Sequence, residues 1–333
     1  MKFRKFGKTS WDVSEIGFGA WAIGGNAWGK QNDSDSLQAL HKALDLGVNF
    51  IDTAQSYGNG HSESLIGQVL KERGEKIGNG SVKVATKIPP SDGHWPPLPY
   101  DDCRIRYSEK YLRQRVEFSL QKLGAEVLDL VQLHTWTRAW NQNPVALEIL
   151  RELKKEGKIL AIGISTPEHD QNSLNDLMKN GWLDAVQVIY NIFEQEPAAE
   201  FLPLAKENQV GVIVRVVFDE GSLTGKYHQD HVFHEGDFRR RYFKGDRLKD
   251  TLQKVEEVKK TIGEYGDPKV DNLLSVAARF ALQNPAVSTV IPGMRNLQQA
   301  EIDCSFSELP PLNKTLYSAL KNHTWRRAFW YGG

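Results

Sequence analysis

Short apolar segments recur eight times along the chain, and longer segments with helical periodicity lie between them. Each apolar segment is rich in Val, Ile and Leu, which is typical of strands buried on both faces of a parallel sheet. The segments are residues 15–19, 48–52, 82–87, 128–134, 159–165, 184–190, 211–217 and 287–293. Eight strands alternating with helices predict an α/β fold, the (β/α)8 or TIM barrel.

No linker or break in composition divides residues 1–333, so we expect one barrel domain. Residues 2–14 precede the first barrel strand and predict a small hairpin that closes the bottom of the barrel. Two segments, residues 88–107 and 219–247, exceed ordinary connections. Long segments in a compact barrel are functional covers or disordered loops, and we place both at the C-terminal face.

The charge balance argues against a polyanionic partner. Lys and Arg number 42, as do Asp and Glu, so no net field draws the chain to nucleic acid or to an anionic membrane. The two cysteines, Cys103 and Cys304, lack metal-ligand spacing and are expected to be free thiols in a reducing compartment. The sequence carries no signal-like start and no long apolar run, so we expect a cytoplasmic protein that binds a small molecule and no metal.

Polar side chains interrupt the predicted strands near their C-terminal ends. Asp52 ends the second strand, Lys87 the third and His134 the fourth. These strand ends meet at one face, where barrels place their active sites. Burying an ionisable side chain is costly without a partner, so we expect the three residues to partner one another. Taken singly, each has a plainer interpretation: an Asp capping a loop, a Lys reaching solvent, or a His satisfied in the core.

Six segments together resemble the aldo-keto reductase family, in the expected order and over nearly the whole chain. They read IDTAQSYGNGHSESLIG, VATKIP, VQLHTW, GIST, LTGKY and VIPGMRN. Among the branches of the family, the chain is similar to bacterial members and to potassium-channel β-subunits. The resemblance implies that Asp52, Tyr57, Lys87 and His134 form a catalytic tetrad.

The chemistry of these four residues suits the reduction of a carbonyl. An unperturbed phenol such as that of Tyr57 is a poor proton donor, with a pKa near ~10. A Lys87 ammonium at about 4 Å and an effective dielectric of ~20 attracts the phenolate by roughly 4 kcal/mol, or about 3 pKa units before desolvation. Asp52 would keep Lys87 charged, and His134 would orient the carbonyl oxygen. The alternative for Tyr57 is an aromatic residue that stacks over a ligand.

The glycines of residues 17–25 do not follow the Rossmann fingerprint, which disfavours a Rossmann dehydrogenase. The resemblance implies instead that NADP(H) lies extended across the barrel mouth. The implied contacts with the nicotinamide half are Gly19, Ala20, Trp21, Asp52, Ser165, Gln187 and Arg215. The implied contacts with the phosphates and adenosine are Gly221, Ser222, Leu223, Thr224, Gly225, Lys226, Pro292, Gly293, Arg295, Gln299 and Asp303.

Arg295 directly precedes a predicted helix start, where an anion gains from unpaired N–H groups. Its guanidinium offers a bidentate fork to phosphate, which favours NADPH over NADH. A solvated helix-start residue is the plainer interpretation of Arg295, and a helix cap is that of Ser165. Two positions depart from the family: Arg215 stands where many relatives carry an aromatic that stacks on the nicotinamide, and Asp303 replaces a more usual Asn.

We expect the substrate to contact Trp21, Tyr57, His134 and Trp136, with Trp28, Trp95 and Trp140 also at the mouth. Aromatic walls suit apolar or sugar-like carbonyl compounds. A basic run at 239–247 is interpreted either as a solvated face or as a cover over the cofactor phosphates.

The sequence therefore predicts an NADPH-dependent enzyme that reduces an aldehyde or ketone to an alcohol. One alternative is an NADP-binding, redox-sensing regulatory protein with slow turnover. A more distant one is a barrel glycosidase, which needs a second carboxylate across the cleft from Asp52. Glu194 and Asp219 are the candidates for that carboxylate, but both fall in loops.

Overall fold

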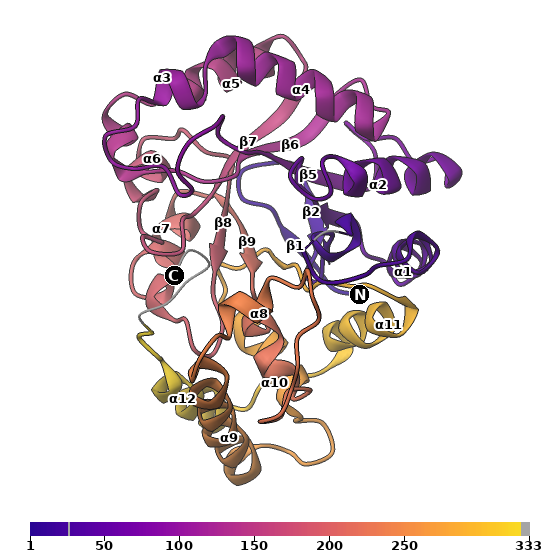
Figure 1. Cartoon of the computed structure of the whole chain (residues 1–333), viewed down its shortest axis with the longest axis vertical. Helices are drawn as coiled ribbons and strands as arrows, with labels where there is room; N and C mark the ends of the chain where they lie inside the picture. The colour runs from indigo at the N-terminus through magenta and orange to yellow at the C-terminus, as the bar shows by residue number, and fades with distance from the viewer. Residues whose placement is uncertain (26, 328–333) are drawn as a thin grey trace.

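The computed structural model of the protein describes residues 1–25 and 27–327. Eight parallel strands curl into a barrel with helices around it (Figure 1), which confirms the predicted fold class. The strands are hydrogen-bonded in chain order: β3 (Phe18–Gly19), β4 (Phe50–Asp52), β5 (Lys83–Ile88), β6 (Leu128–Leu133), β7 (Ile159–Ser165), β8 (Ala185–Ile189), β9 (Gly211–Arg215) and β10 (Thr289–Val290). Parallel bridges from Ile16 to Val290 and from Gly19 to Gly293 join the first strand to the last and close the barrel.

The helices are mostly amphipathic connections that cover the outer face of the strands. Those before β8 are α1 (Asp33–Asp45), α2 (His61–Glu72), α3 (Cys103–Arg106), α4 (Glu109–Leu123), α5 (Val145–Lys155) and α6 (Asn175–Lys179). Those after β8 are α7 (Phe201–Glu207), α8 (Arg239–Tyr242), α9 (Arg247–Tyr265), α10 (Leu273–Leu282), α11 (Leu297–Ser305) and α12 (Lys314–Leu320). In the described part of the chain, no helix combines the length and the apolar run needed to cross a membrane.

The predicted N-terminal hairpin is present and plugs the barrel from below. Strands β1 (Phe3–Lys5) and β2 (Asp12–Ser14) pair antiparallel. The fully buried Phe6 packs into the barrel floor, with its ring 5.3 Å from that of Phe50. A Cβ on Gly211 would lie 2.8 Å from the Phe6 ring, so the first residue of β9 has to be glycine to admit the plug.

Both long segments are ordered covers at the C-terminal face. Residues 88–107 contain α3 and place Trp95 edge-on against His134, with ring centroids 5.1 Å apart. Residues 219–247 contain a 3-10 helix, Asp219–Thr224, and α8. A bridge between Trp28 and Asp237 fastens this second segment to the loop after β3.

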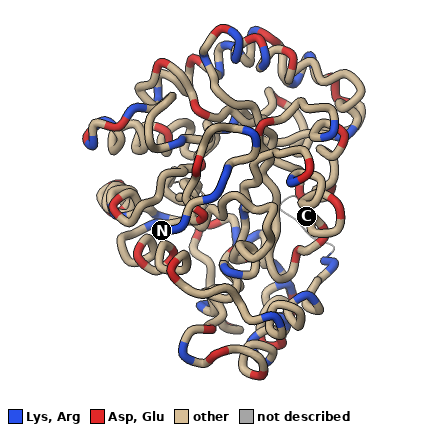
Figure 2. Tube along the Cα trace, turned by 180° about the vertical axis from the view of Figure 1, so that it is seen from behind, with Lys and Arg blue, Asp and Glu red and all other residues tan. Residues whose placement is uncertain are grey.

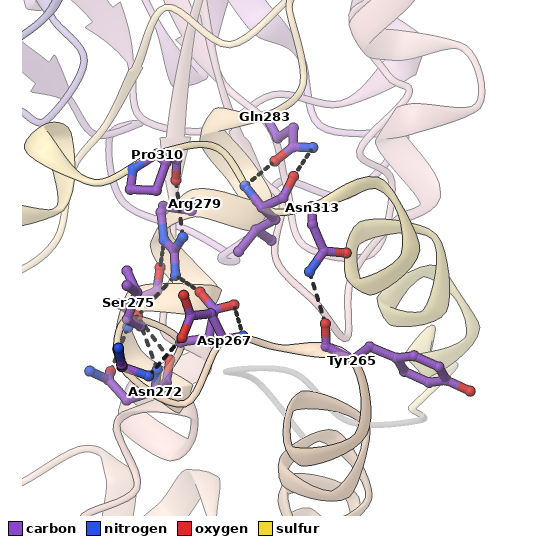
Figure 3. A network of polar contacts seen from close by, with 12 residues as sticks. Tyr265, Asp267, Asn272, Ser275, Arg279, Gln283, Pro310 and Asn313 are labelled. Atoms are coloured by element: carbon purple, nitrogen blue, oxygen red, sulfur yellow. Dashed lines mark hydrogen bonds and ion pairs between the residues drawn. The ribbon is translucent and has the colours of Figure 1, made fainter.

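Polar contacts hold the C-terminal part of the chain against α9 and α10. Arg279 of α10 pairs with Asp271 and donates to the Pro310 carbonyl at 3.0 Å (Figure 3). Asn313, the cap of α12, donates to the carbonyl of Tyr265 at 2.8 Å. Lys and Arg residues are interspersed with Asp and Glu residues along the Cα trace (Figure 2).

Replacing Phe6 by Ala should lower the free energy of unfolding by about 3–5 kcal/mol, because it removes the plug of the barrel floor and leaves a cavity. Urea unfolding followed by fluorescence measures the change. Phe3→Ala on the same hairpin is the matched control, since Phe3 is 52% exposed and should cost far less. Equal losses in the two variants would show that the hairpin is not a plug.

Candidate active site

The polar residues of the mouth form a layer directly above an apolar layer inside the barrel. The apolar layer contains Phe50, Ala85, Leu130, Ala161, Ala185 and Ile213. Alternate strand residues face the same side, so the residue two positions later in each strand faces inward one layer higher. Those residues are Asp52, Lys87, Gln132, Gly163, Gln187 and Arg215.

The Asp52 carboxylate is the centre of this polar layer. It is 3% exposed and accepts a hydrogen bond from Lys87 Nζ at 2.6 Å. Its other oxygen accepts from Gln187 Nε2 at 2.7 Å and from Gln132 Nε2 at 3.3 Å. We did not predict a role for Gln132. The available signal is a Gln two residues before His134, in a segment whose other residues before His134 are apolar except for Asp129.

Lys87 connects Asp52 to Tyr57. Its ammonium donates to Tyr57 Oη at 3.2 Å and to the Thr53 carbonyl at 2.8 Å. The turn that carries Tyr57 depends on Gly58, whose φ is +66° and whose Cβ, if present, would lie 2.2 Å from the Gly24 carbonyl oxygen. The close contact between these two loops therefore fixes where the phenol points.

An indole and an imidazole pack against the phenol. Trp21 stacks on Tyr57 with centroids 5.9 Å apart, and His134 meets it edge-on at 5.8 Å. His134 Nδ1 lies 3.4 Å from Ser56 Oγ. That contact leaves the Nε2 side of the imidazole for a ligand in the mouth.

The pKa of Tyr57 lies well above its ordinary value, because burial and then the charge of Asp52 favour the neutral phenol. This corrects our expectation that Lys87 would lower it, since Asp52 already compensates the ammonium. Burial lowers the pKa of Lys87 itself, and the charge of Asp52 opposes that effect. Burial and the charges of Lys87 and Arg215 lower the pKa of His134 well below its ordinary value, so its ring is neutral near pH 7.

Ser165 and Gln187 lie side by side across the mouth from Tyr57. They are register partners in β7 and β8, and both are buried. The next helix, α6, begins only at Asn175, so Ser165 does not cap it.

At the junction of β3 and β10, a Cβ on Gly19 would lie 2.5 Å from the Ile291 carbonyl oxygen, which explains the glycine beside the buried Ala20.

Arg215 ends β9 and is tethered to the loop after β7. One of its terminal nitrogens donates to the Thr166 carbonyl at 3.0 Å and to Glu168 at 3.2 Å. Arg215 Nε is buried and has no hydrogen-bond partner among the described residues. The pairing of Arg215 with Glu168 depends on the path of a loop and has no signal in the sequence.

The loop after β9 has a backbone that side chains rarely adopt. Asp219 and Glu220 have φ of +47° and +54°, and both are buried. Asp219 accepts from Arg327 at 2.6 Å, so it is committed to an ion pair and offers little to a glycosidase mechanism. Burial, and next the charge of Asp219, raise the pKa of Glu220 to about 8.

The residues expected at the phosphates lie around the same loop, although some of their polar groups have partners within the protein. Thr224 Oγ1 donates to the Gly221 carbonyl at 2.6 Å, and Ser222 Oγ to Asp219 at 2.8 Å. Lys226 is exposed along much of its length. Partial desolvation, and next the charges of Arg239 and Arg295, lower its pKa.

Arg295 is held at the edge of the mouth rather than free in solvent. Its Nε donates to Gln31 Oε1 and a terminal nitrogen to the Lys30 carbonyl, both at 2.8 Å. Its backbone N–H donates to Gln299 Oε1 at 2.8 Å, while Asp303 lies one turn further along α11 and is 5% exposed.

The basic run divides between inward and outward residues. Arg239 is buried, pairs with Asp237 and lies 4.6 Å from the centroid of the Trp28 ring. Arg240 and Lys244 are exposed. Arg239 therefore fits the interpretation of the run as a cover, whereas Arg240 and Lys244 fit that of a solvated face.

The expected substrate contact of Trp136 is wrong. Its side chain is fully buried, donates from Nε1 to Asn141 at 2.8 Å and packs edge-on against Trp140. Both tryptophans belong to the main core behind the strands. Trp21 and Trp28, by contrast, lie at the mouth, where both pack on Phe238 with centroids within 5 Å.

Comparisons with known proteins agree with this architecture. The sequence model of the aldo/keto reductase family matches residues 15–324. The chain is 31% identical to aldo-keto reductase YhdN of Bacillus subtilis, with 90% of this chain and 87% of that protein covered. It is 32% identical to the NADH-specific methylglyoxal reductase of Escherichia coli, covering 70% and 72%. The structure of glycerol dehydrogenase AKR11B4 from Gluconobacter oxydans superposes with a TM-score of 0.76 at 27% identity, covering 97% and 94%.

Asp303→Asn should stabilise the protein in a pH-dependent way. Burial raises the pKa of Asp303 to about 8 in the folded state, against ~3.9 in an unfolded chain. The folded state holds this proton more tightly, so wild-type stability falls as pH rises from about 4 to about 8. The Asn variant escapes this loss, and we expect it to be about 2–5 kcal/mol more stable at pH 9 and equal at pH 4.

Chemical unfolding at the two pH values measures this difference. The exposed Asp92→Asn is the matched control and should change stability little at either pH. A gain from Asp303→Asn that is the same at pH 4 and pH 9 would contradict the assignment of a buried, protonated carboxyl.

Proposed function

The chain belongs to the aldo/keto reductase family of oxidoreductases, and we propose that it reduces an aldehyde or ketone to an alcohol with NADPH. One observation carries the proposal: a single buried ammonium, Lys87 Nζ, contacts both Asp52 at 2.6 Å and Tyr57 Oη at 3.2 Å. We further propose that residues 1–333 form one catalytic domain acting on a small carbonyl compound. The buried free thiols Cys103 and Cys304 support the cytoplasm as its compartment.

Each residue of the tetrad has a distinct part in this proposal. Tyr57 donates its proton to the carbonyl oxygen as negative charge develops there. Lys87 stabilises the phenolate that remains, and Asp52 holds the ammonium in place. His134, neutral near pH 7, donates an N–H to the same oxygen and orients the carbonyl.

The mouth offers the groups that a nicotinamide nucleotide needs, and bound NADPH would supply the hydride. Ser165 and Gln187 offer neutral hydrogen-bonding groups suited to a carboxamide. After desolvation, the charges of Arg239 and Arg295 lower the pKa of Lys226, and the charge of Arg239 lowers that of Arg295. An anion stabilises such a cluster of cations. The backbone of residues 221–225 and of Gly293, together with this cluster, is the proposed site of the phosphates.

We propose NADP(H) rather than NAD(H), because the cationic cluster is suited to a third phosphate. A relative, the Escherichia coli methylglyoxal reductase, is named NADH-specific. The choice of nucleotide therefore has to be tested on this chain through Arg295.

Tyr57→Phe should lower the rate of carbonyl reduction by about 10²–10⁴-fold, because it removes the proton donor. NADPH binding, measured by fluorescence titration, should change little. Tyr100→Phe, which removes a phenol that is 97% exposed, is the control and should keep full activity. In the wild type, the raised pKa of Tyr57 should keep the rate of carbonyl reduction constant from pH 7 to 9. Alcohol oxidation needs the phenolate, so its rate should rise about tenfold per pH unit over the same range.

Undiminished turnover by Tyr57→Phe would reject the proton-donor role.

Single-turnover measurements on the wild type bear on the redox-sensing alternative. Release of only one alcohol per bound NADPH over the time of the assay would favour a sensor over an enzyme.

Arg295→Ala should weaken NADPH binding by about 10–100-fold and NADH binding less than about threefold, if its guanidinium holds the third phosphate. Arg240→Ala removes an exposed arginine from the neighbouring segment and should change neither dissociation constant. Equal losses for both nucleotides would show that Arg295 only braces the loop of Lys30 and Gln31.

A further inference from the structure

We propose that Arg215 forms a cationic platform beneath the nicotinamide, so that the protein holds the reduced cofactor more tightly than the oxidised one. The inference rests on the proposed use of a nicotinamide nucleotide. It adds that the site is poised toward alcohol oxidation, the reverse of the reaction named above, and that Glu168 limits this bias.

The position of Arg215 follows from the register of the barrel. Ile213 points into the apolar floor, so Arg215, two residues later in β9, points inward one layer higher. Tyr57 comes from the loop after β4, and β8 lies four strands away around the eight-stranded barrel, on the opposite wall. A planar ring that delivers hydride to a carbonyl held by Tyr57 therefore lies against the wall that Ser165, Gln187 and Arg215 form.

The guanidinium is held in one orientation before any ligand binds. Its terminal nitrogen is fixed by the Thr166 carbonyl at 3.0 Å and by Glu168 at 3.2 Å, and its side chain is 16% exposed. Arg215 Nε is buried without a hydrogen-bond partner among the described residues. A guanidinium plane stacks on flat rings, and a fixed plane in this wall is suited to that contact.

The positive charge of Arg215 reaches across the mouth. It acts to lower the pKa values of Tyr57, Lys87 and His134. Of the other charged groups around it, Lys87 is paired with Asp52. Glu220, whose pKa is raised to about 8, is largely neutral at pH 7.

The remaining charges near the platform are also compensated. Asp219 is paired with Arg327, and Arg239 with Asp237. Glu168 is thus the main group that can compensate the positive charge of Arg215. It accepts a hydrogen bond from the terminal nitrogen that also binds the loop after β7.

Hydride transfer changes the charge of the ring that faces this platform. In carbonyl reduction, the carbonyl carbon gains a hydride from the dihydronicotinamide and the oxygen gains the Tyr57 proton, which leaves one positive charge on the ring. A fixed cation beside the ring disfavours that charge. The oxidised cofactor is then bound more weakly than the reduced one, and the bound couple becomes a stronger oxidant.

The ratio of the dissociation constants of NADP⁺ and NADPH measures this effect without any turnover. Tryptophan quenching and nucleotide fluorescence give both constants for the wild-type protein and its variants. Arg215→Gln removes the charge and should lower the ratio about tenfold, which corresponds to about 30 mV for a two-electron couple. Arg215→Lys keeps the charge and loses the plane, so both constants should rise together and the ratio should change less than about threefold.

Glu168→Gln supplies an independent test of opposite sign. It removes the compensating charge from a loop residue and should raise the ratio about threefold, even if the Arg215 variants fold poorly. An unchanged ratio in both Arg215→Gln and Glu168→Gln would overturn the platform while leaving the reductase assignment intact. A wild-type protein that binds neither nucleotide would overturn the proposed function itself.

Discussion

The buried carboxylate of Asp52 is the interaction on which the rest of the site depends. It accepts hydrogen bonds from Lys87, Gln187 and Gln132, which come from three different strands. A buried ion pair seldom adds stability beyond what apolar side chains would give, but removing one partner leaves an uncompensated charge at a large cost. The ion pair therefore orients side chains rather than stabilising the fold. Asp52 fixes the position of the Lys87 ammonium, and that ammonium contacts the Tyr57 phenol.

This orientation is possible because the barrel interior is divided into an apolar and a polar layer. Phe6 closes the floor from outside the barrel and packs on Phe50, and Asp52 lies two residues above Phe50 in the same strand. With water excluded from below, the hydrogen bonds of the polar layer act at a low effective dielectric. The same exclusion raises the pKa of Tyr57, so the phenol is protonated near pH 7, which is the state that the proposed proton donation requires.

The sequence was sufficient for the barrel and for the polar strand ends, because apolar runs and the interruptions in them are local signals. It was insufficient wherever the outcome depended on several neighbours at once. The pairwise estimate for Tyr57 and Lys87 was made before desolvation, and burial together with the charge of Asp52 reverses the direction of the net pKa shift of Tyr57. Trp136 follows a strand just as His134 does, but two residues further on the chain has turned into the core. The protonated state of Glu220 depends on a loop conformation that no periodicity encodes.

That loop also explains how the mouth is fixed without a ligand. Val216 has φ of +57°, which is rare for a β-branched residue, and such a conformation costs of order 1–3 kcal/mol. Contacts from outside the mouth hold it: Asn191 Nδ2 donates to the Val216 carbonyl at 2.9 Å, and Arg327 binds Asp219 at 2.6 Å. The loop after β8 and the C-terminal segment thus impose the strained turn directly after Arg215. The platform and the proposed phosphate loop consequently share one rigid support, separate from the network around Asp52.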